Sequence, residues 1–263
     1  MNTTMTTIAK PKIFFCGDNH THFRHIIDAV REHQPDAIVL LGDIEAKQPL
    51  EMELAPLLGK TEIRFIHGNH DTDSEENWRY LAHSRLGHLN LNARVDTVAG
   101  VRIAGLGGVF RGKVWRPWEP KHFNNYDDVA RYVARKQKFE MWSAQRVESM
   151  LRNHSSTIFP DVYDALAKLR ADVLVVHEAP SCHPHGFDAI DLLAQSMGAK
   201  TVFHGHHHDR LDYQSSFDKL GFRTYGVGFC GITDLDGNVV LAGDMDDVRL
   251  RTSPYDQDDK GET

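Results

Sequence analysis

The sequence predicts an α/β protein built on a mainly parallel sheet. Short apolar runs at residues 12–16, 37–41 and 63–66 indicate buried strands, and segments compatible with helices separate them. Each run leads into a polar turn that contains glycine. A β-α-β-α-β series of this kind is typical of parallel sheets. Such sheets carry their chemistry at the carboxyl ends of the strands.

The connections in this first half have recognisable helix signals. One apolar helical face is predicted from the spacing of Phe23, Ile26, Ile27 and Val30. We expect Pro35 to end that helix. A second helix is predicted to begin near Pro49, because proline suits a first helical turn, and to end at Gly59. Residues 74–84 have helical composition, and Ser74 is a candidate N-cap.

The alternation of predicted strands and helices resumes after residue 152. We expect helices at 161–169 and 187–197, strands at 173–176 and 201–203, and terminal strands at 222–229 and 239–242. Before residue 109, the two runs 94–98 and 101–106 are predicted to form a hairpin. Residues 246–263 are acidic and polar, so we expect a loose tail.

Residues 109–152 differ from their surroundings. They hold three of the four tryptophans, and ten Lys and Arg residues against five Asp and Glu residues. Because the whole chain carries −7, the remainder carries −12. We expect helix over 127–151. Since roughly 45 residues seldom bury enough apolar surface to fold alone, we interpret this segment as a cap or lid inserted into a single domain over residues 1–245.

The composition also limits the class of protein. The cysteines Cys16, Cys182 and Cys230 form no C-x-x-C pair, which argues against a disulfide framework and a thiolate zinc site. Residues 1–10 lack the apolar stretch of a signal peptide. No apolar run approaches the roughly 20 residues of a membrane helix. We therefore expect a cytoplasmic protein without a membrane partner.

Polar side chains that can bind metal follow five of the predicted strands. They are Asp18 and His20, Asp43, Asn69 and His70, His177, and His206 with His208. Oxygen and imidazole ligands without sulfur suit Mn, Fe, Zn or similar divalent ions. These residues are too many for a single ion, whereas two ions that share a bridging carboxylate would use them.

Each residue also has a plainer explanation. An aspartate after glycine, such as Asp43, is more often a helix cap than a ligand. A single histidine, such as His177, is more often a hydrogen-bonded core or surface residue. Recurrence of the pattern after five separate strands favours ligands over these explanations.

In this order the motifs resemble the signature of the calcineurin-like metallophosphoesterase superfamily, D-x-H, G-D, G-N-H-D/E, H and G-H-x-H. They stand here as Asp18-Asn19-His20, Gly42-Asp43, Gly68-Asn69-His70-Asp71, His177 and Gly205-His206-His207-His208. The similarity extends over about residues 12–209. It implies a four-layer α-β-β-α sandwich with a dinuclear metal site at the carboxyl ends of the strands.

The resemblance assigns roles by position. One metal would take Asp18, His20, Asp43 and His208, and the other would take Asp43, Asn69, His177 and His206. Asp43 would bridge two divalent ions, with Mn favoured over Fe or Zn. His70 would face the phosphate and protonate the leaving oxygen. Asp71 is a candidate partner that orients His70, or a cap of the following helix.

The resemblance further implies a metal-dependent phosphoesterase that hydrolyses a phosphodiester or a phosphomonoester by attack of a metal-bridging hydroxide. Residues 42–47 lack the later groups of the protein-phosphatase motif G-D-x-x-D-R-G, which argues against that branch. One alternative is a nuclease on the same scaffold, although the charge of −12 outside the insertion weighs against nucleic acid. Another is a non-catalytic, metal-stabilised binding protein. We expect a small phosphoester substrate.

The insertion supplies candidate substrate-binding residues. Arg111 offers a planar guanidinium for phosphate oxygens, and Trp115 offers an indole for stacking. Glycines at 107, 108 and 112 would give a mobile flap its freedom. The alternative for Trp115 is that it only packs the loop against the core.

Overall fold

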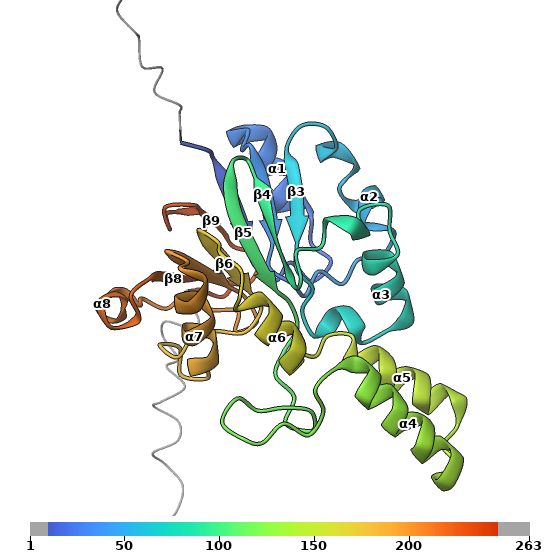
Figure 1. Ribbon diagram of the computed structural model, residues 1–263. Helices are drawn as coiled ribbons and strands as arrows, with labels where there is room; N and C mark the ends of the chain where they lie inside the picture. Colours follow the sequence, from blue (N-terminus) through green and yellow to red (C-terminus); the bar gives the residue numbers. More distant parts are fainter. Residues whose placement is uncertain (1–9, 247–263) are drawn as a thin grey trace, which may run out of the picture.

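Two sheets face each other in the computed structural model, which describes residues 10–246 (Figure 1). The first has the order β10-β9-β1-β2-β3, with strands Val239–Leu241, Ile232–Asp234, Ile13–Cys16, Ala37–Leu40 and Glu62–Phe65. The second has the order β4-β5-β6-β7-β8, with strands Arg94–Val98, Val101–Leu106, Val173–Val176, Thr201–His204 and Arg223–Gly226. The α/β fold class predicted from the sequence is confirmed.

The centre of each sheet is parallel. β1, β2 and β3 pair in parallel, as do β5, β6, β7 and β8, whereas β4, β9 and β10 pair antiparallel at the edges. The sequences IFFC, AIVL and VLVV of β1, β2 and β6 are buried at every position. Continuous apolar runs are what strands covered on both faces require.

Alternation along β1 shows how the layers are packed. Ile13 and Phe15 belong to the core between the sheets, where Phe15 stacks on Phe203 of β7 with ring centroids 3.7 Å apart. Phe14 and Cys16 point the opposite way, into a second core beneath the helices of the first sheet. A third core lies between the second sheet and its helices, so three cores separate the four layers of an α-β-β-α sandwich.

Helices cover the outer face of each sheet. α1 (Arg24–His33), α2 (Leu50–Glu53) and α3 (Glu75–Ala82) bury apolar residues against the first sheet. α6 (Pro160–Leu166), α7 (Asp188–Met197) and α8 (Phe217–Leu220) do the same for the second. Ser74 caps α3 as predicted, because its side chain accepts a hydrogen bond from the amide of Asn77. No helix within residues 10–246 is long and apolar enough to cross a membrane.

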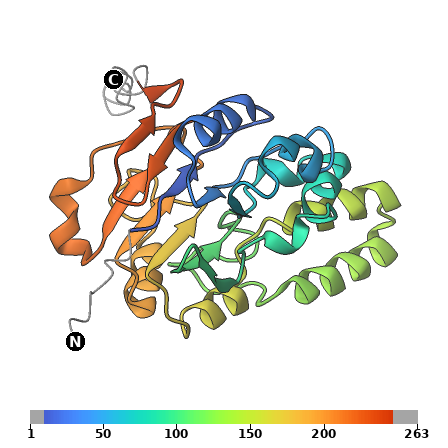
Figure 2. The ribbon, with the colours of Figure 1, turned by 90° about the horizontal axis from the view of Figure 1, so that it is seen from above.

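The predicted helix over 127–151 is two helices. α4 (Tyr126–Glu140) and α5 (Ala144–His154) lie side by side and extend away from the sheets (Figures 1 and 2). The break is at Met141, whose φ of 52° lies in the left-handed region. Ser143 then caps α5 by accepting from the amide of Arg146. A capping box at Asn125 begins α4.

Other predicted boundaries are also wrong. The second helix is short, since α2 is followed by a separate 3₁₀ turn at Ala55–Leu57. The strand expected over 222–229 ends at residue 226, and β9 follows unpredicted. Of the predicted tail 246–263, only Asp246 lies within the described residues. Asp246 is buried and accepts from the amide of Gly243, so it is fixed to the body of the protein.

Candidate metal centre

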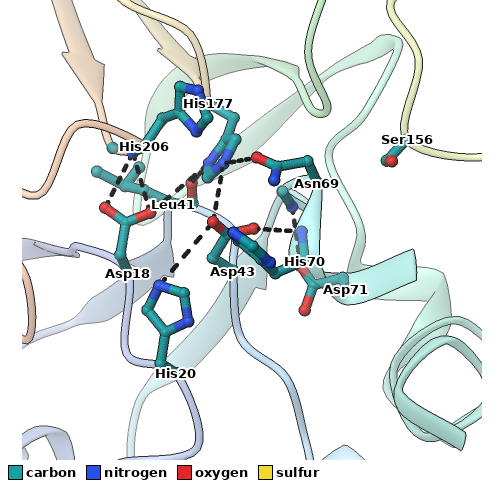
Figure 3. Close-up of polar contacts among 12 residues, drawn as sticks. Asp18, His20, Leu41, Asp43, Asn69, His70, Asp71, Ser156, His177 and His206 are labelled. Atoms are coloured by element: carbon teal, nitrogen blue, oxygen red, sulfur yellow. Dashed lines mark hydrogen bonds and ion pairs between the residues drawn. The ribbon is translucent and has the colours of Figure 1, made fainter. Parts of the chain in front are cut away.

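Seven of the eight candidate ligand and proton-transfer residues converge in Figure 3 at the carboxyl ends of β1, β2, β3, β6 and β7. The eighth, His208, joins them through its Nε2, which lies 3.0 Å from Nε2 of His20. The sheets therefore bring together side chains that are up to 190 positions apart, from Asp18 to His208.

One group of possible ligands consists of Asp18, His20, Asp43 and His208, whose ligand atoms all lie within 4.8 Å of one another. Nδ1 of His20 is 2.6 Å from Oε2 of Glu45. If Nδ1 carries the proton and donates it to this carboxylate, Nε2 is unprotonated. Its lone pair is then directed at the other three ligands, Asp18, Asp43 and His208. Carboxylate partners of this kind commonly fix the tautomer of a metal-binding histidine.

A second group consists of Asp43, His177 and His206. Nδ1 of His177 lies 2.8 Å from the carbonyl oxygen of Leu41. This hydrogen bond turns Nε2 of His177 toward Oδ2 of Asp43, at 3.3 Å, and toward Oδ1 of Asn69, at 3.2 Å. Asp43 belongs to both groups, so it occupies the position of a bridging ligand.

Two buried atoms in these groups form no hydrogen bond among residues 10–246: Nδ1 of His206 and Oδ2 of Asp43, whose nearest charged neighbour is Nε2 of His177 at 3.3 Å. A buried polar atom left unsatisfied costs roughly 1–3 kcal/mol. Both atoms belong to the group of Asp43, His177 and His206, so a cation bound by that group would satisfy them. The residues present therefore fit a pair of divalent ions.

The backbone at this site adopts conformations that side chains other than glycine rarely take. Asp43, His206 and His208 have φ values of 47°, 72° and 59°. Residues held this way cluster at functional sites. A Cβ on Gly68 would lie 2.2 Å from Oδ1 of Asp43, which explains the glycine there.

Burial and neighbouring charges shift the pKa values of the residues in this centre. Burial, with the nearby carboxylate of Asp43, raises the pKa of Asp18 to about 7. Burial opposes a charge on His177, but the carboxylates of Asp43 and Asp18 outweigh it and raise the pKa of His177 to about 10. The contact between Nε2 of His177 and Oδ2 of Asp43 thus favours a proton on His177. A divalent cation would displace this proton, because a metal-binding imidazole must be neutral.

His70 lies at the open side of the centre with its side chain 46% exposed. Its amide donates to Oδ1 of Asp43 at 2.8 Å, and its Nδ1 lies 2.7 Å from Oδ2 of Asp73. Burial opposes a charge on this ring, and the bond to Asp73 overcomes it and raises the pKa of His70. The arrangement leaves Nε2 available for a substrate.

The contact that orients His70 comes from Asp73, which corrects the sequence-based assignment of this role to Asp71. Residues 70–72 form a 3₁₀ turn, in which side chains three residues apart lie on the same side. Asp71 instead points inward and is fully buried. Its carboxylate accepts from the amides of Ile44, Glu45 and Gly68 at 2.7–2.9 Å and so ties the loops after β2 and β3 together.

Sequence reasoning missed Glu45 and Asp73 as partners of His20 and His70. The spacing His-x-x-Asp at residues 70–73 is a signal that could have revealed Asp73, given a 3₁₀ turn. No local pattern links His20 to Glu45, because the two residues meet only through the pairing of β1 with β2.

The two predicted substrate-binding residues have different positions. Trp115 is only 6% exposed, and its ring packs edge-on against Phe110 and Tyr163. This placement matches the packing alternative for Trp115 and leaves no face for a substrate. Arg111 is partly buried and donates from Nη2 to Oγ of Ser156 at 3.1 Å.

Comparison with known proteins identifies the family. The family profile described as calcineurin-like phosphoesterase matches residues 11–210, which includes every candidate ligand. The chain belongs to the calcineurin-like phosphoesterase family. The resemblance recognised from the sequence motifs is thereby confirmed.

One protein is similar in sequence and one solved structure is similar in fold. An uncharacterized protein of Haemophilus influenzae is 36% identical over 235 residues, which are 87% of this chain and 96% of that protein. The crystal structure of TT1561 of Thermus thermophilus superimposes with a TM-score of 0.53 at 14% identity, covering 89% of this chain and 99% of that one. At this identity the second similarity supports the fold alone.

Proposed function

We propose that this calcineurin-like phosphoesterase hydrolyses a small phosphodiester or phosphomonoester at a dinuclear metal centre. The observation that carries the proposal is the position of Asp43, a buried carboxylate shared by two groups of ligands, with one oxygen that lacks a hydrogen-bond partner among the described residues. A site that binds a single ion would not need a carboxylate in this shared position.

The chain supplies the ligands in two sets. Asp18, His20 and His208 would hold one ion, Asn69, His177 and His206 would hold the other, and Asp43 would contact both. Two divalent ions that share Asp43 would lower the pKa of a water molecule bound to them and would neutralise the charge on phosphoryl oxygens. Since only two carboxylates are among these ligands, the centre keeps a positive charge that attracts phosphate.

His70 is placed to transfer a proton. Its Nδ1 is held by Asp73, so the opposite nitrogen faces the open side of the centre. With its pKa raised by this contact, the ring can donate from Nε2 to the leaving oxygen. Groups of this kind contribute roughly 10²–10⁴ in rate.

Metal removal tests the proposal directly. We expect protein treated with a chelator to lose hydrolysis of bis(p-nitrophenyl) phosphate and p-nitrophenyl phosphate, and to regain it with Mn²⁺. Thiol-blocking reagents should leave the rate unchanged, because Cys16 and Cys230 are buried and no cysteine belongs to the ligand groups. Hydrolysis of the diester at full rate by metal-free protein would refute the dinuclear assignment.

We also propose that the insertion at 109–152 selects substrates as a lid over the centre. Arg111 lies at its base, and Ser156 links its guanidinium to the His70 turn. The Arg111→Ala variant should raise KM for large phosphodiesters by about tenfold or more, since a hydrogen bond to a charged group contributes roughly 1.5–3 kcal/mol. Small substrates and metal content should change little. Equal losses for all substrates would contradict the lid.

A further inference from the structure

A cavity of about 1190 Å³ lies within the insertion, between the loop after β5 and the paired helices α4 and α5. Both sides of the insertion line it: Phe110, Arg111 and Lys113 from the loop, and Tyr132, Trp142 and Arg146 from the helices. This volume exceeds what a side-chain packing defect leaves and is slightly above the roughly 300–1,000 Å³ of typical sites for organic ligands.

The cavity has a strong excess of positive charge. Arg111, Lys113, Arg116 and Arg146 line it, with Glu119 as the carboxylate among its lining residues. Glu119 lies 3.6 Å from Arg116 and offsets that charge. Burial, together with the charges of Arg111 and Lys113, lowers the pKa of His154 to about 4, so this lining histidine is neutral at pH 7. The surplus of three positive charges is suited to phosphate groups.

Aromatic rings accompany these charges. Phe123 and Tyr132 pack at 5.3 Å, and the guanidinium of Arg146 lies 4.2 Å from the ring of Trp142. Rings and guanidinium planes are the surfaces on which nucleobases stack. A purely apolar ligand would not need the cations, and inorganic phosphate would not need the rings.

Hydrogen bonds connect the cavity to the turn that carries Asn69 and His70. Arg111 donates to Ser156, whose Oγ lies 2.7 Å from Oγ1 of Thr72. Oγ1 of Thr72 donates in turn to the carbonyl of Asn69. Arg152 of α5 fixes the insertion to the same turn by donating to the carbonyl of Thr72 at 3.1 Å. Figure 3 shows Ser156 on the Asn69 side of the centre, apart from the candidate ligands.

We propose that this cavity binds the non-reacting part of a nucleotide substrate, with a further phosphate on its cations and the base against its rings. The inference rests on the proposed function, because the reacting phosphate is assigned to the metal centre. The substrate class is then an ester of a nucleoside diphosphate, in which two phosphates are available for the two sites. Water would add to the phosphorus at the metal centre, the P–O bond to the esterified alcohol would break, and the alcohol would leave with the proton of His70.

Binding to metal-free protein separates the cavity from the metal centre. We would titrate chelator-treated protein with ADP, pyrophosphate and adenosine by isothermal calorimetry. ADP should bind at least tenfold more tightly than either fragment, since only ADP uses both cations and rings. Pyrophosphate or adenosine binding as tightly as ADP would overturn the nucleotide assignment.

Variants locate the binding. Lys113 and Arg146 are exposed cavity residues, so we expect the double variant with Lys113→Ala and Arg146→Ala to fold. Because it lacks two of the cations that line the cavity, it should bind ADP at least tenfold more weakly than the wild type. The single variants provide the same test if the double variant is unstable. Lys138→Ala removes an exposed charge of α4 outside the cavity lining and should bind ADP like the wild type. Unchanged ADP binding in the cavity variants would overturn the inference.

Hydrolysis of bis(p-nitrophenyl) phosphate by the Mn²⁺-loaded protein distinguishes the two proposals. If this small diester is hydrolysed but ADP does not bind, the cavity inference fails and the proposed function stands. If ADP binds as described but no phosphoester is hydrolysed, the proposed function fails instead.

Discussion

The Asp43→Ala variant is expected to lose bound metal and phosphoester hydrolysis together. Asp43 lies in both ligand groups, so its removal takes a ligand from each ion. Metal ions contribute several kcal/mol of transition-state stabilisation, and each 1.36 kcal/mol corresponds to tenfold in rate. We therefore expect a decrease of at least roughly 10³-fold, with fewer than two ions per chain by elemental analysis.

Two controls make the Asp43 experiment specific. Asp28→Ala removes an exposed carboxylate of α1, outside the ligand groups, and should keep both metal and activity. Circular dichroism and thermal unfolding would show whether Asp43→Ala remains folded. This check is necessary because the carboxylate of Asp43 accepts a hydrogen bond from the amide of His70. A folded Asp43→Ala protein that retains two ions would contradict the bridging position.

The fold could be predicted where a short run of sequence decides it alone. The bounds of the β4 and β5 hairpin match the prediction, because apolar residues flank a turn at residues 99–100. The break between α4 and α5 could not be foreseen in the same way. Met141 adopts its left-handed conformation between two helices that pack on each other, and helical composition continues on both sides.

The candidate ligands could also be placed, since the ends of parallel strands meet at one edge whatever the details of the loops. The side chains around them depend on those details. Asp71 and Asp73 differ by only two positions, yet one joins three amides and the other holds His70. Trp115 likewise depends on packing that only the folded insertion shows.

Exchanging His70 for alanine should separate proton transfer from metal binding. The ring is absent from the two groups that share Asp43, so metal content should stay near that of the wild type. The rate should fall roughly 10²–10⁴-fold. The loss should be largest for substrates with a poor leaving group, such as an alkyl phosphodiester, and smaller for p-nitrophenyl esters, whose leaving group needs little protonation.

Asp73→Asn gives the matching test of the positioning residue. It keeps the size of the side chain but removes the charge that raises the pKa of His70, so the rate should fall less than in His70→Ala and with the same leaving-group trend. Glu45, His70 and Asp73 also bring ligand atoms within 4.8 Å of one another. Elemental analysis decides between the roles: if His70→Ala loses as much metal as Asp43→Ala, His70 is a metal ligand and not the proton donor.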